Sequence, residues 1–199
     1  METIAEQSEN IVGDTKKYII ITARRLFSKY SYLGVSMSDI AQKLNITKAA
    51  LYYHFIGKAE IYEKVLDNVF NDLSLSVSQA MSEGTTDKKL HKLIKNYLDF
   101  GSKEKNLIKS LMLKLSPGEA KITKQVARLR EQVADLIRPV IEEMMVSKKL
   151  TEKVDSRLLT SMLTGMMDGL LLEYSFFNEK IDSEKISNQI IALLFQNWN

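Results

Sequence analysis

The segment from Val35 to Lys58, VSMSDIAQKLNITKAALYYHFIGK, constrains the fold of this chain more than any other part of it. It contains two short stretches with apolar residues at helical spacing, separated by a tight turn. Ser36 and Asp39 form a capping-box pattern, in which a hydroxyl residue begins a helix and an acidic residue follows three positions later. Asn45 tolerates the left-handed conformation that ends a helix, and Thr47 can cap the next one. The pattern predicts a helix-turn-helix, whose second helix has the size to enter a DNA major groove.

A third helix is predicted before this pair. Its apolar positions fall on one helical face, at Ile19, Ala23, Leu26, Phe27 and Tyr30. We therefore expect residues 15–58 to form a three-helix DNA-binding domain and residues 1–14 to form a disordered arm.

Positive charge is concentrated in the same domain. Residues 15–58 hold eight basic residues and one acidic residue, whereas the whole chain has a net charge of only +3, so the remainder is mildly acidic. The basic residues are Lys16, Lys17, Arg24, Arg25, Lys29, Lys43, Lys48 and Lys58. A solvated charged face explains any single one of them, but neutralisation of DNA phosphates better explains their concentration beside a helix-turn-helix.

The rest of the chain, residues 59–199, has the pattern of a larger helical domain. Its helices are predicted at 59–81, at 87–100, up to 115, from 116 onward, at 155–177 and at 183–198. Two prolines and eight glycines are too few for the many turns of an all-β protein. The predicted fold class is all-α, with an N-terminal three-helix domain, a larger C-terminal helical domain and about nine helices in total.

Composition excludes several kinds of site and location. The chain has no cysteine, which removes disulfides and thiolate metal sites, and we predict no metal site and no cofactor. No apolar run is long enough to span a bilayer, and the polar, acidic N-terminus does not have the pattern of a secretory signal. We therefore expect a cytoplasmic protein that does not enter a membrane.

Residues 36–58 resemble the DNA-binding signature of the tetracycline-repressor (TetR) family of bacterial and archaeal one-component regulators. The resemblance is carried by Asp39-Ile40-Ala41, the turn Asn45-Ile46-Thr47, the run Leu51-Tyr52-Tyr53-His54-Phe55, and Lys58. The LYYHF run followed by Gly-Lys is far more specific than a general helix-turn-helix pattern. The resemblance implies a sequence-specific DNA-binding transcriptional regulator.

The resemblance also implies roles for individual residues. Lys48 and Ala49 would face base edges, with Tyr52 one turn later, while Lys58 would hold a phosphate. Met37 stands where a hydroxyl residue is common, and core packing of Tyr52 remains an open alternative because aromatic residues usually pack. The predicted DNA-binding residues are Ser36, Met37, Ser38, Thr47, Lys48, Ala49, Tyr52, Tyr53, His54 and Lys58.

The last two predicted helices carry broad apolar stripes, which suggest a homodimer. The stripe on the first is wider than one packing contact needs, and Gly165 and Gly169 allow another helix to approach closely. A monomer core is the alternative reading. The resemblance favours a dimer interface over about 155–198, and a dimer also reads two DNA half-sites.

The resemblance further implies a repressor released by a small, largely apolar effector, which the sequence leaves unidentified. Methionine and aromatic residues suit an adaptable apolar cavity, although core packing explains any single one of them. The candidate effector-binding residues in the C-terminal domain are Phe100, Met112, Met162, Met166, Tyr174 and Phe177.

Two other functions stay open at this point. A TetR-fold DNA binder controlled by a protein partner, with no small-molecule effector, would have a well-filled body instead of a cavity. An enzyme would need a nucleophile, an acid–base pair or a metal set. The two histidines lie in separate domains, and no H-x-x-x-H, G-x-S-x-G or phosphate-loop pattern is present, so we predict that the chain is not an enzyme.

Overall fold

The computed structural model describes residues 4–81, 84–107, 120–147 and 155–196, and these contain helices and turns without any strand. The helices are α1 (Ile4–Tyr30), α2 (Met37–Leu44), α3 (Lys48–His54), α4 (Lys58–Ala80), α5 (Thr86–Lys103), α7 (Ala120–Ser147), α8 (Ser156–Phe177) and α9 (Ser183–Ile191), followed by a π-helical turn at Ala192–Gln196. The all-α prediction is confirmed. The helix end expected near residue 115 and the helix start expected at residue 116 lie outside the described residues. Within the described ranges, no helix combines the length and the apolar character needed to cross a bilayer.

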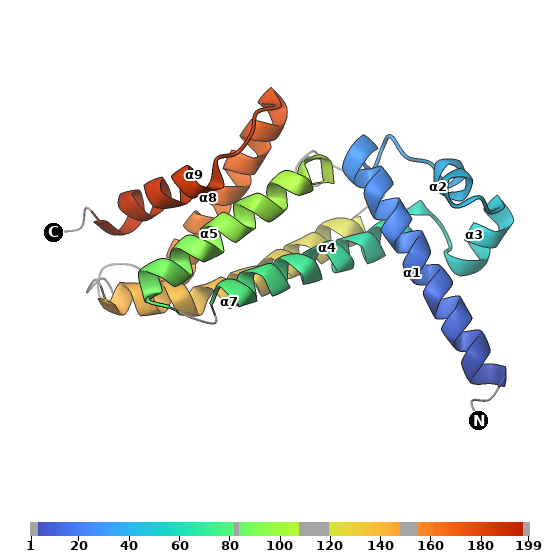
Figure 1. Ribbon diagram of the computed structural model, residues 1–199, viewed down its shortest axis with the longest axis horizontal. Helices are drawn as coiled ribbons and strands as arrows, with labels where there is room; N and C mark the ends of the chain where they lie inside the picture. The colour runs from blue at the N-terminus through green and yellow to red at the C-terminus, as the bar shows by residue number, and fades with distance from the viewer. Residues whose placement is uncertain (1–3, 82–83, 108–119, 148–154, 197–199) are drawn as a thin grey trace.

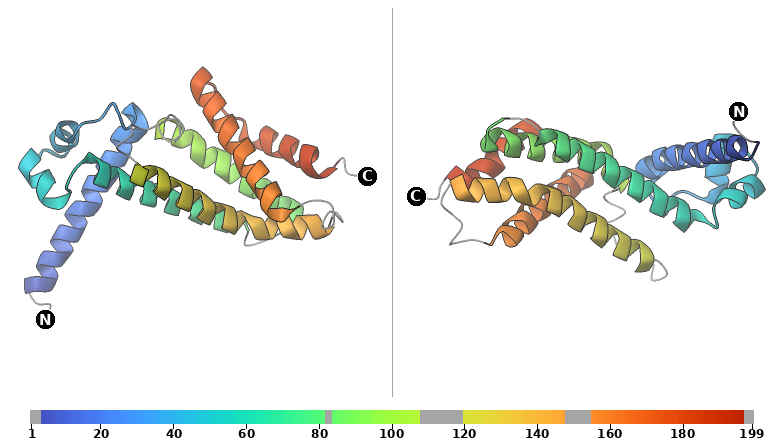
Figure 2. Two further views of the ribbon diagram at one scale, coloured as in Figure 1. Left: turned by 180° about the vertical axis from the view of Figure 1, so that it is seen from behind. Right: turned by 90° about the horizontal axis from the view of Figure 1, so that it is seen from below.

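The helices form a small head and an elongated body (Figure 1). Helices α1, α2 and α3 gather at one end of the molecule, and α4 leads from them into the body. There α5 is central, because it contacts α4 and α7 on one side and α8 and α9 on the other (Figure 2).

An aromatic cluster holds the head on α4. The rings of Phe27 and Tyr62 meet edge-on with centroids 5.1 Å apart, and the ring of Tyr32 lies 4.5 Å from that of Tyr62. Tyr62 belongs to α4 and has no exposed surface. Ile40 of α2 and Leu51 of α3 are also fully buried, so the apolar faces predicted for the two short helices do form the head core.

Helix α4 belongs to both cores. The stripe predicted for it is buried along its whole length, at Ile61, Val65, Val69, Leu73 and Val77. The first three of these pack in the head core and the last two in the body core. A shift of α4 therefore changes the packing of both parts of the molecule.

One boundary differs from the sequence prediction. Helix α1 begins at Ile4, so the disordered arm expected over residues 1–14 is wrong for residues 4–14. This stretch contains no proline, and residues such as Ala5, Glu6 and Gln7 have high helix propensity, so a helix formed by the following residues can extend backwards through it.

Candidate functional site

The start of α2 is held by the capping box that the sequence predicts. The Ser36 hydroxyl oxygen accepts a hydrogen bond from the Asp39 backbone N–H at 3.2 Å, and the Ser36 backbone N–H donates to the Asp39 carboxylate at 2.7 Å. The Ser36 hydroxyl also donates to that carboxylate. These hydrogen bonds, first the one from the hydroxyl and then the one from the backbone, lower the pKa of Asp39.

Local backbone geometry then sets the direction of α3. Asn45 adopts the left-handed conformation, with φ 56° and ψ 40°, and ends α2 as predicted. The Thr47 hydroxyl caps α3 by accepting from the Ala50 backbone N–H at 3.1 Å. Because Leu51 and Phe55 are buried against the head core, the opposite face of α3 points to solvent.

The exposed surface of α3 carries four of the ten predicted DNA-binding side chains. Lys48 and Ala49 are exposed at the beginning of the helix. Tyr52 and Tyr53 are 51% and 79% exposed, so the alternative reading of Tyr52 as a core residue is wrong. His54 is half-buried, and its ring packs edge-on against the ring of Tyr53 at 5.2 Å. Three further predicted residues, Ser36, Ser38 and Thr47, are exposed at or before the starts of the two short helices.

Two predicted DNA contacts are placed differently. Met37 is only 8% exposed, because it is the first apolar residue of the buried face of α2, so its side chain packs in the head core instead of facing solvent. The Lys58 ammonium donates to the Tyr32 carbonyl oxygen at 3.0 Å and lies 4.2 Å from the centre of the Tyr32 ring. Lys58 therefore helps to hold the head together.

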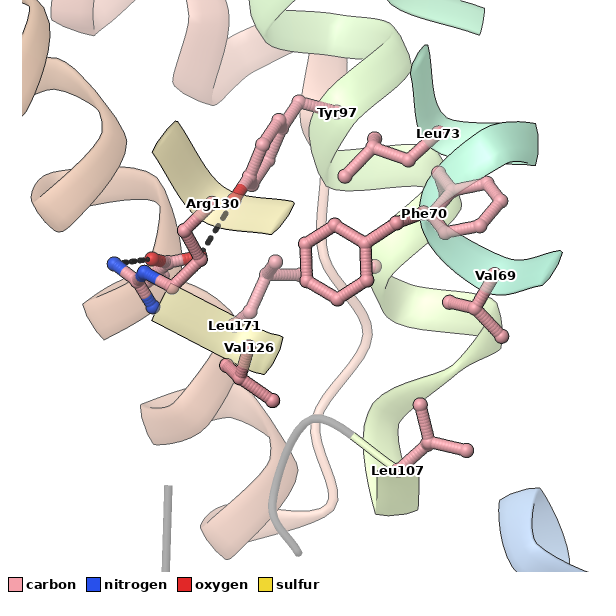
Figure 3. Close-up of a pocket in the computed structure, with 11 residues that line it drawn as sticks. Val69, Phe70, Leu73, Tyr97, Leu107, Val126, Arg130 and Leu171 are labelled. Atoms are coloured by element: carbon pink, nitrogen blue, oxygen red, sulfur yellow. Dashed lines mark hydrogen bonds and ion pairs between the residues drawn. The ribbon is translucent and has the colours of Figure 1, made fainter. Parts of the chain in front are cut away.

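The body contains a narrow apolar pocket between α4, α5, α7 and α8 (Figure 3). Measured as the space open to the centre of a water molecule, its volume is about 70 Å³. At Gly101 a Cβ would lie 2.2 Å from Leu171 Cδ1, so this glycine permits the close packing of α5 on α8 that narrows the pocket. The lining residues are Val69, Phe70, Leu73, Tyr97, Phe100, Gly101, Leu107, Val126, Arg130, Asp168 and Leu171.

Of the six residues that the sequence singles out for an effector, Phe100 lines this pocket. Met112 lies outside the described residues. Met162 and Phe177 are 49% and 69% exposed on the outside of α8, so their placement in a cavity is wrong. Met166 and Tyr174 pack against the body core without lining the pocket. Helical spacing alone does not separate a cavity wall from the outer surface of the same helix.

A polar group at one side of the pocket was missed by the sequence reasoning. The Tyr97 hydroxyl donates to the Asp168 carboxylate at 2.7 Å, and Arg130 forms an ion pair with the same carboxylate, as the dashed lines in Figure 3 show. Burial raises the pKa of Asp168, an effect that the charge of Arg130 and the hydrogen bonds from Tyr97 and Arg130 only partly oppose. Burial, followed by the nearby carboxylate, raises the pKa of Tyr97 well above its ordinary value. One feature of the sequence pointed to this group, because Asp168 lies within the apolar stripe of α8. A buried carboxylate needs hydrogen-bond or ion-pair partners.

A second polar network joins the head to the body, and we call it the Arg24 network. Arg24 of α1 donates to Glu104, just beyond α5, from Nε at 3.0 Å and from Nη2 at 2.8 Å. Its Nη1 donates to Asn68 at 2.8 Å and pairs with Asp72, both on α4. The Ser28 hydroxyl donates to the second oxygen of Glu104 at 2.5 Å. Burial lowers the pKa of Arg24, but the hydrogen bonds to Asp72 and Glu104 outweigh it and raise the pKa.

The apolar pocket and the Arg24 network are formed by the same two segments, the middle of α4 and the end of α5 with the residues that follow it. Val69 and Leu73 line the pocket, whereas Asn68 and Asp72 on the neighbouring face of α4 hold Arg24. Glu104 lies between two pocket-lining residues of the chain, Gly101 and Leu107. Arg24 thus bridges the two segments that form pocket walls.

Comparison with known proteins gives matches over both parts of the chain. The family model of bacterial regulatory proteins of the tetR family matches residues 19–65, and that of the YsiA-like protein C-terminal region matches residues 63–197. The biofilm operon icaADBC HTH-type negative transcriptional regulator IcaR of Staphylococcus epidermidis is 48% identical over 56 residues, which make up 28% of this chain and 30% of IcaR. The chain therefore matches less than a third of that relative's length.

Solved structures match almost the whole chain. The fatty acid degradation regulator FadR from Bacillus halodurans has a TM-score of 0.78 and 16% identity, over 92% of this chain and 96% of that one. The transcriptional regulator FadR from Bacillus subtilis in complex with stearoyl-CoA has a TM-score of 0.76 and 19% identity, over 91% and 98%. At these identities the similarity is one of fold.

Proposed function

The chain belongs to the TetR family of transcriptional regulators, and on that premise we propose that it is a homodimeric repressor released from operator DNA by a small, largely apolar molecule. The observation that carries the proposal is the apolar pocket, whose walls are also tied to the head by Arg24. IcaR is named as a negative transcriptional regulator, which supports repression over activation in this proposal. In this proposal residues 15–58 bind DNA and residues 59–199 bind the effector and the second subunit, in the cytoplasm.

In the proposed DNA complex, α3 enters the major groove with its N-terminal end towards the bases. Lys48 can donate to guanine O6 or N7, and the Ala49 methyl group can touch a thymine methyl. Tyr53, whose side chain is exposed, can contact a phosphate through its hydroxyl. One seven-residue helix reads few bases, which is why the proposal includes a dimer that reads two half-sites.

The outer face of α8 supports a dimer through about 155–198. Leu158, Met162 and Phe176 are 57%, 49% and 53% exposed along one face of this helix. Gly165 and Gly169 lie on the same face, and a Cβ added at either one would meet no atom within 4 Å. Two glycines four positions apart, flanked on the same face by exposed apolar side chains, fit a second helix packed closely alongside.

The pocket supports a small-molecule effector over control by a protein partner alone. It is an apolar space with a small polar group of Tyr97, Asp168 and Arg130, which is the usual composition of a ligand site. The FadR structure from Bacillus subtilis contains stearoyl-CoA, and we therefore propose an effector with an aliphatic chain.

The size of the pocket links effector binding to movement. A volume of about 70 Å³ is well below the roughly 300–1,000 Å³ of usual small-molecule sites, so a ligand with an aliphatic chain has to push the walls apart. Separation of α4 from the end of α5 would pull Asn68 and Asp72 away from Glu104, and Arg24 could not hold both. The head would then change its angle to the body, and two heads in a dimer would lose the spacing of their half-sites, about 34–36 Å or a multiple of it.

The test measures operator affinity in the presence of acyl-CoA compounds. An operator is selected from random duplexes, and its affinity for the purified chain is measured by fluorescence anisotropy with short, medium and long acyl chains. We expect at least one compound to reduce operator affinity by about 5- to 150-fold, and the operator to weaken binding of that compound by the same factor. Saturating ligand with unchanged operator affinity would contradict the proposal.

A pair of substitutions on α7 separates the pocket from the outer surface. Val126 lines the pocket, whereas Val146 is 67% exposed on the same helix. Val126→Phe should keep operator binding but lose the response to the effector, because the added ring occupies the ligand space. Val146→Phe should release operator DNA in response to the effector as the wild-type protein does. A full response in Val126→Phe would place the effector elsewhere.

A further inference from the structure

The apolar pocket has one polar side, which is formed by Tyr97, Asp168 and Arg130. Figure 3 shows Tyr97 and Arg130 at this side of the pocket, with Val69 and Leu107 at the opposite side. Among the described residues that line the pocket, Asp168 and Arg130 are the two that carry charge, and they form an ion pair with each other. A charged ligand group would upset this balance, because an anion is repelled by the carboxylate and a cation by the guanidinium.

The Asp168 carboxylate can accept a further hydrogen bond. An ionised carboxylate has about four lone-pair sites, and here the Tyr97 hydroxyl and the Arg130 guanidinium occupy two of them. The Asp168 side chain is only 10% exposed, whereas the Arg130 side chain is 41% exposed, so water reaches the remaining N–H groups of Arg130 far more easily than the carboxylate. The raised pKa of Asp168 agrees with this picture, since its two partners do not fully replace the water that burial removes. The polar side of the pocket is therefore short of hydrogen-bond donors.

We propose that Asp168 accepts a hydrogen bond from a neutral donor on the effector, so that the fitting ligand is an aliphatic chain that bears a hydroxyl group. The proposal rests on the function proposed above for the aliphatic chain, and adds the polar group that this chain carries. A hydroxyl is small and uncharged and has one O–H to donate. An ether oxygen only accepts, and a carboxylate brings a second negative charge beside Asp168.

This contact fixes the direction in which the ligand lies. The polar side is built by α5, α7 and α8, so a hydroxyl bound there is held where three helices of the body meet. The opposite wall includes Val69 of α4, whose neighbour Asn68 belongs to the Arg24 network. The apolar end of the chain is then the part that presses on α4 and on the joint between head and body.

The experiment is isothermal titration of the full chain, at neutral pH, with two isomers that differ in their hydrogen-bond donor. These are n-octanol, which has an O–H group, and heptyl methyl ether, which has none. We expect the alcohol to bind about tenfold more tightly, the effect of a hydrogen bond to a charged group. Octanoate and octylammonium, titrated in the same way, should both bind more weakly than the alcohol because each adds an unbalanced charge.

Three variants assign the preference for the alcohol to one side chain. In Asp168→Asn the preference should fall to about twofold or less, because the single amide oxygen is already needed by Tyr97 and Arg130. The matched control is Asp135→Asn, which changes an exposed carboxylate that pairs with Arg138 on α7 and should keep the tenfold preference. Tyr97→Phe removes the competing hydroxyl and should also keep the preference. Circular dichroism checks the folding of each variant.

The outcomes separate this proposal from the function on which it rests. Equal binding of alcohol and ether to the wild-type protein overturns it, as does a preference for the alcohol that survives in Asp168→Asn. Octanoate or octylammonium binding as tightly as the alcohol, or no binding of any of the four probes, also overturns it, even if acyl-CoA compounds release operator DNA. A preference that depends on Asp168, with operator affinity unchanged at saturating alcohol, would sustain the contact and contradict the proposed function.

Discussion

Replacing Glu104 by glutamine tests the Arg24 network most directly. The substitution keeps the size of the side chain and removes its charge. In the present structure this carboxylate accepts two N–H groups of Arg24 and the Ser28 hydroxyl, and the Glu104 and Arg24 side chains are 11% and 19% exposed. A glutamine amide is uncharged and cannot accept all three of these hydrogen bonds, because its nitrogen only donates.

The expected loss of stability follows from the partners that remain. Breaking a fully buried ion pair costs about 3–5 kcal/mol, but here Arg24 keeps Asp72 and Asn68 and retains some contact with water. We therefore expect Glu104→Gln to lower the free energy of unfolding by about 2 kcal/mol, near the value for a hydrogen bond to a charged group. For a chain of this size the melting temperature should fall by about 4–8 °C.

The assay is urea and thermal unfolding followed by circular dichroism, with a double-mutant cycle that adds Arg24→Gln. The cycle should give a coupling energy of about 1–2 kcal/mol. The control is Glu131→Gln, because Glu131 pairs with Arg157 at 3.5 Å on the surface, with side chains 63% and 72% exposed, and should cost less than about 1 kcal/mol. Two results would refute a specific stabilising role of the Arg24 network. One is that the losses in free energy of unfolding of Glu104→Gln and Arg24→Gln simply add in the double variant. The other is that Glu104→Gln and Glu131→Gln lose the same free energy of unfolding.

Four further predictions concern the head and the proposed dimer. Lys48→Ala should change the preferred base at one operator position. Lys58→Ala should lower the affinity for all DNA duplexes alike and reduce the slope of log affinity against log salt concentration by about one. The folding of Lys58→Ala is checked as a control, because Lys58 also donates to the Tyr32 carbonyl. A uniform loss for Lys48→Ala would instead make Lys48 a phosphate contact. Gly165→Glu should produce monomers in sedimentation and abolish specific operator binding, and an intact dimer would place the interface elsewhere. Because the pKa of Asp39 is lowered in the folded protein, its charge should make the wild-type protein more stable than Asp39→Asn. This difference in the free energy of unfolding should be complete at pH values above 3.8, the ordinary pKa, and should decline as the pH falls below it. Urea unfolding at a series of acid pH values measures the difference, and a constant difference would contradict the prediction.

Local features of the head were predictable because their causes lie within a few positions of each other in the chain. The capping box, the left-handed Asn45 and the Thr47 cap depend on hydrogen bonds between residues three to five positions apart. The apolar stripe of α4 was predictable for the same reason, since helical geometry fixes which residues share a face. Met37 shows the limit, because a position that resembles a DNA contact is also the first apolar position of a buried face.

Long-range features were decided only by the tertiary structure. Tyr97 and Asp168 are 71 positions apart, and Arg24 and Glu104 are 80 positions apart, so no spacing in the sequence joins them. Periodicity marks the stripe on α8 as apolar, but Leu163 and Met167 on it are fully buried, whereas Leu158 and Met162 are about half exposed. Which side of a helix faces a cavity, the core or solvent depends on which other helices pack against it. That is settled by packing among distant segments, whereas the caps, the turn and the recognition helix are settled by the residues themselves.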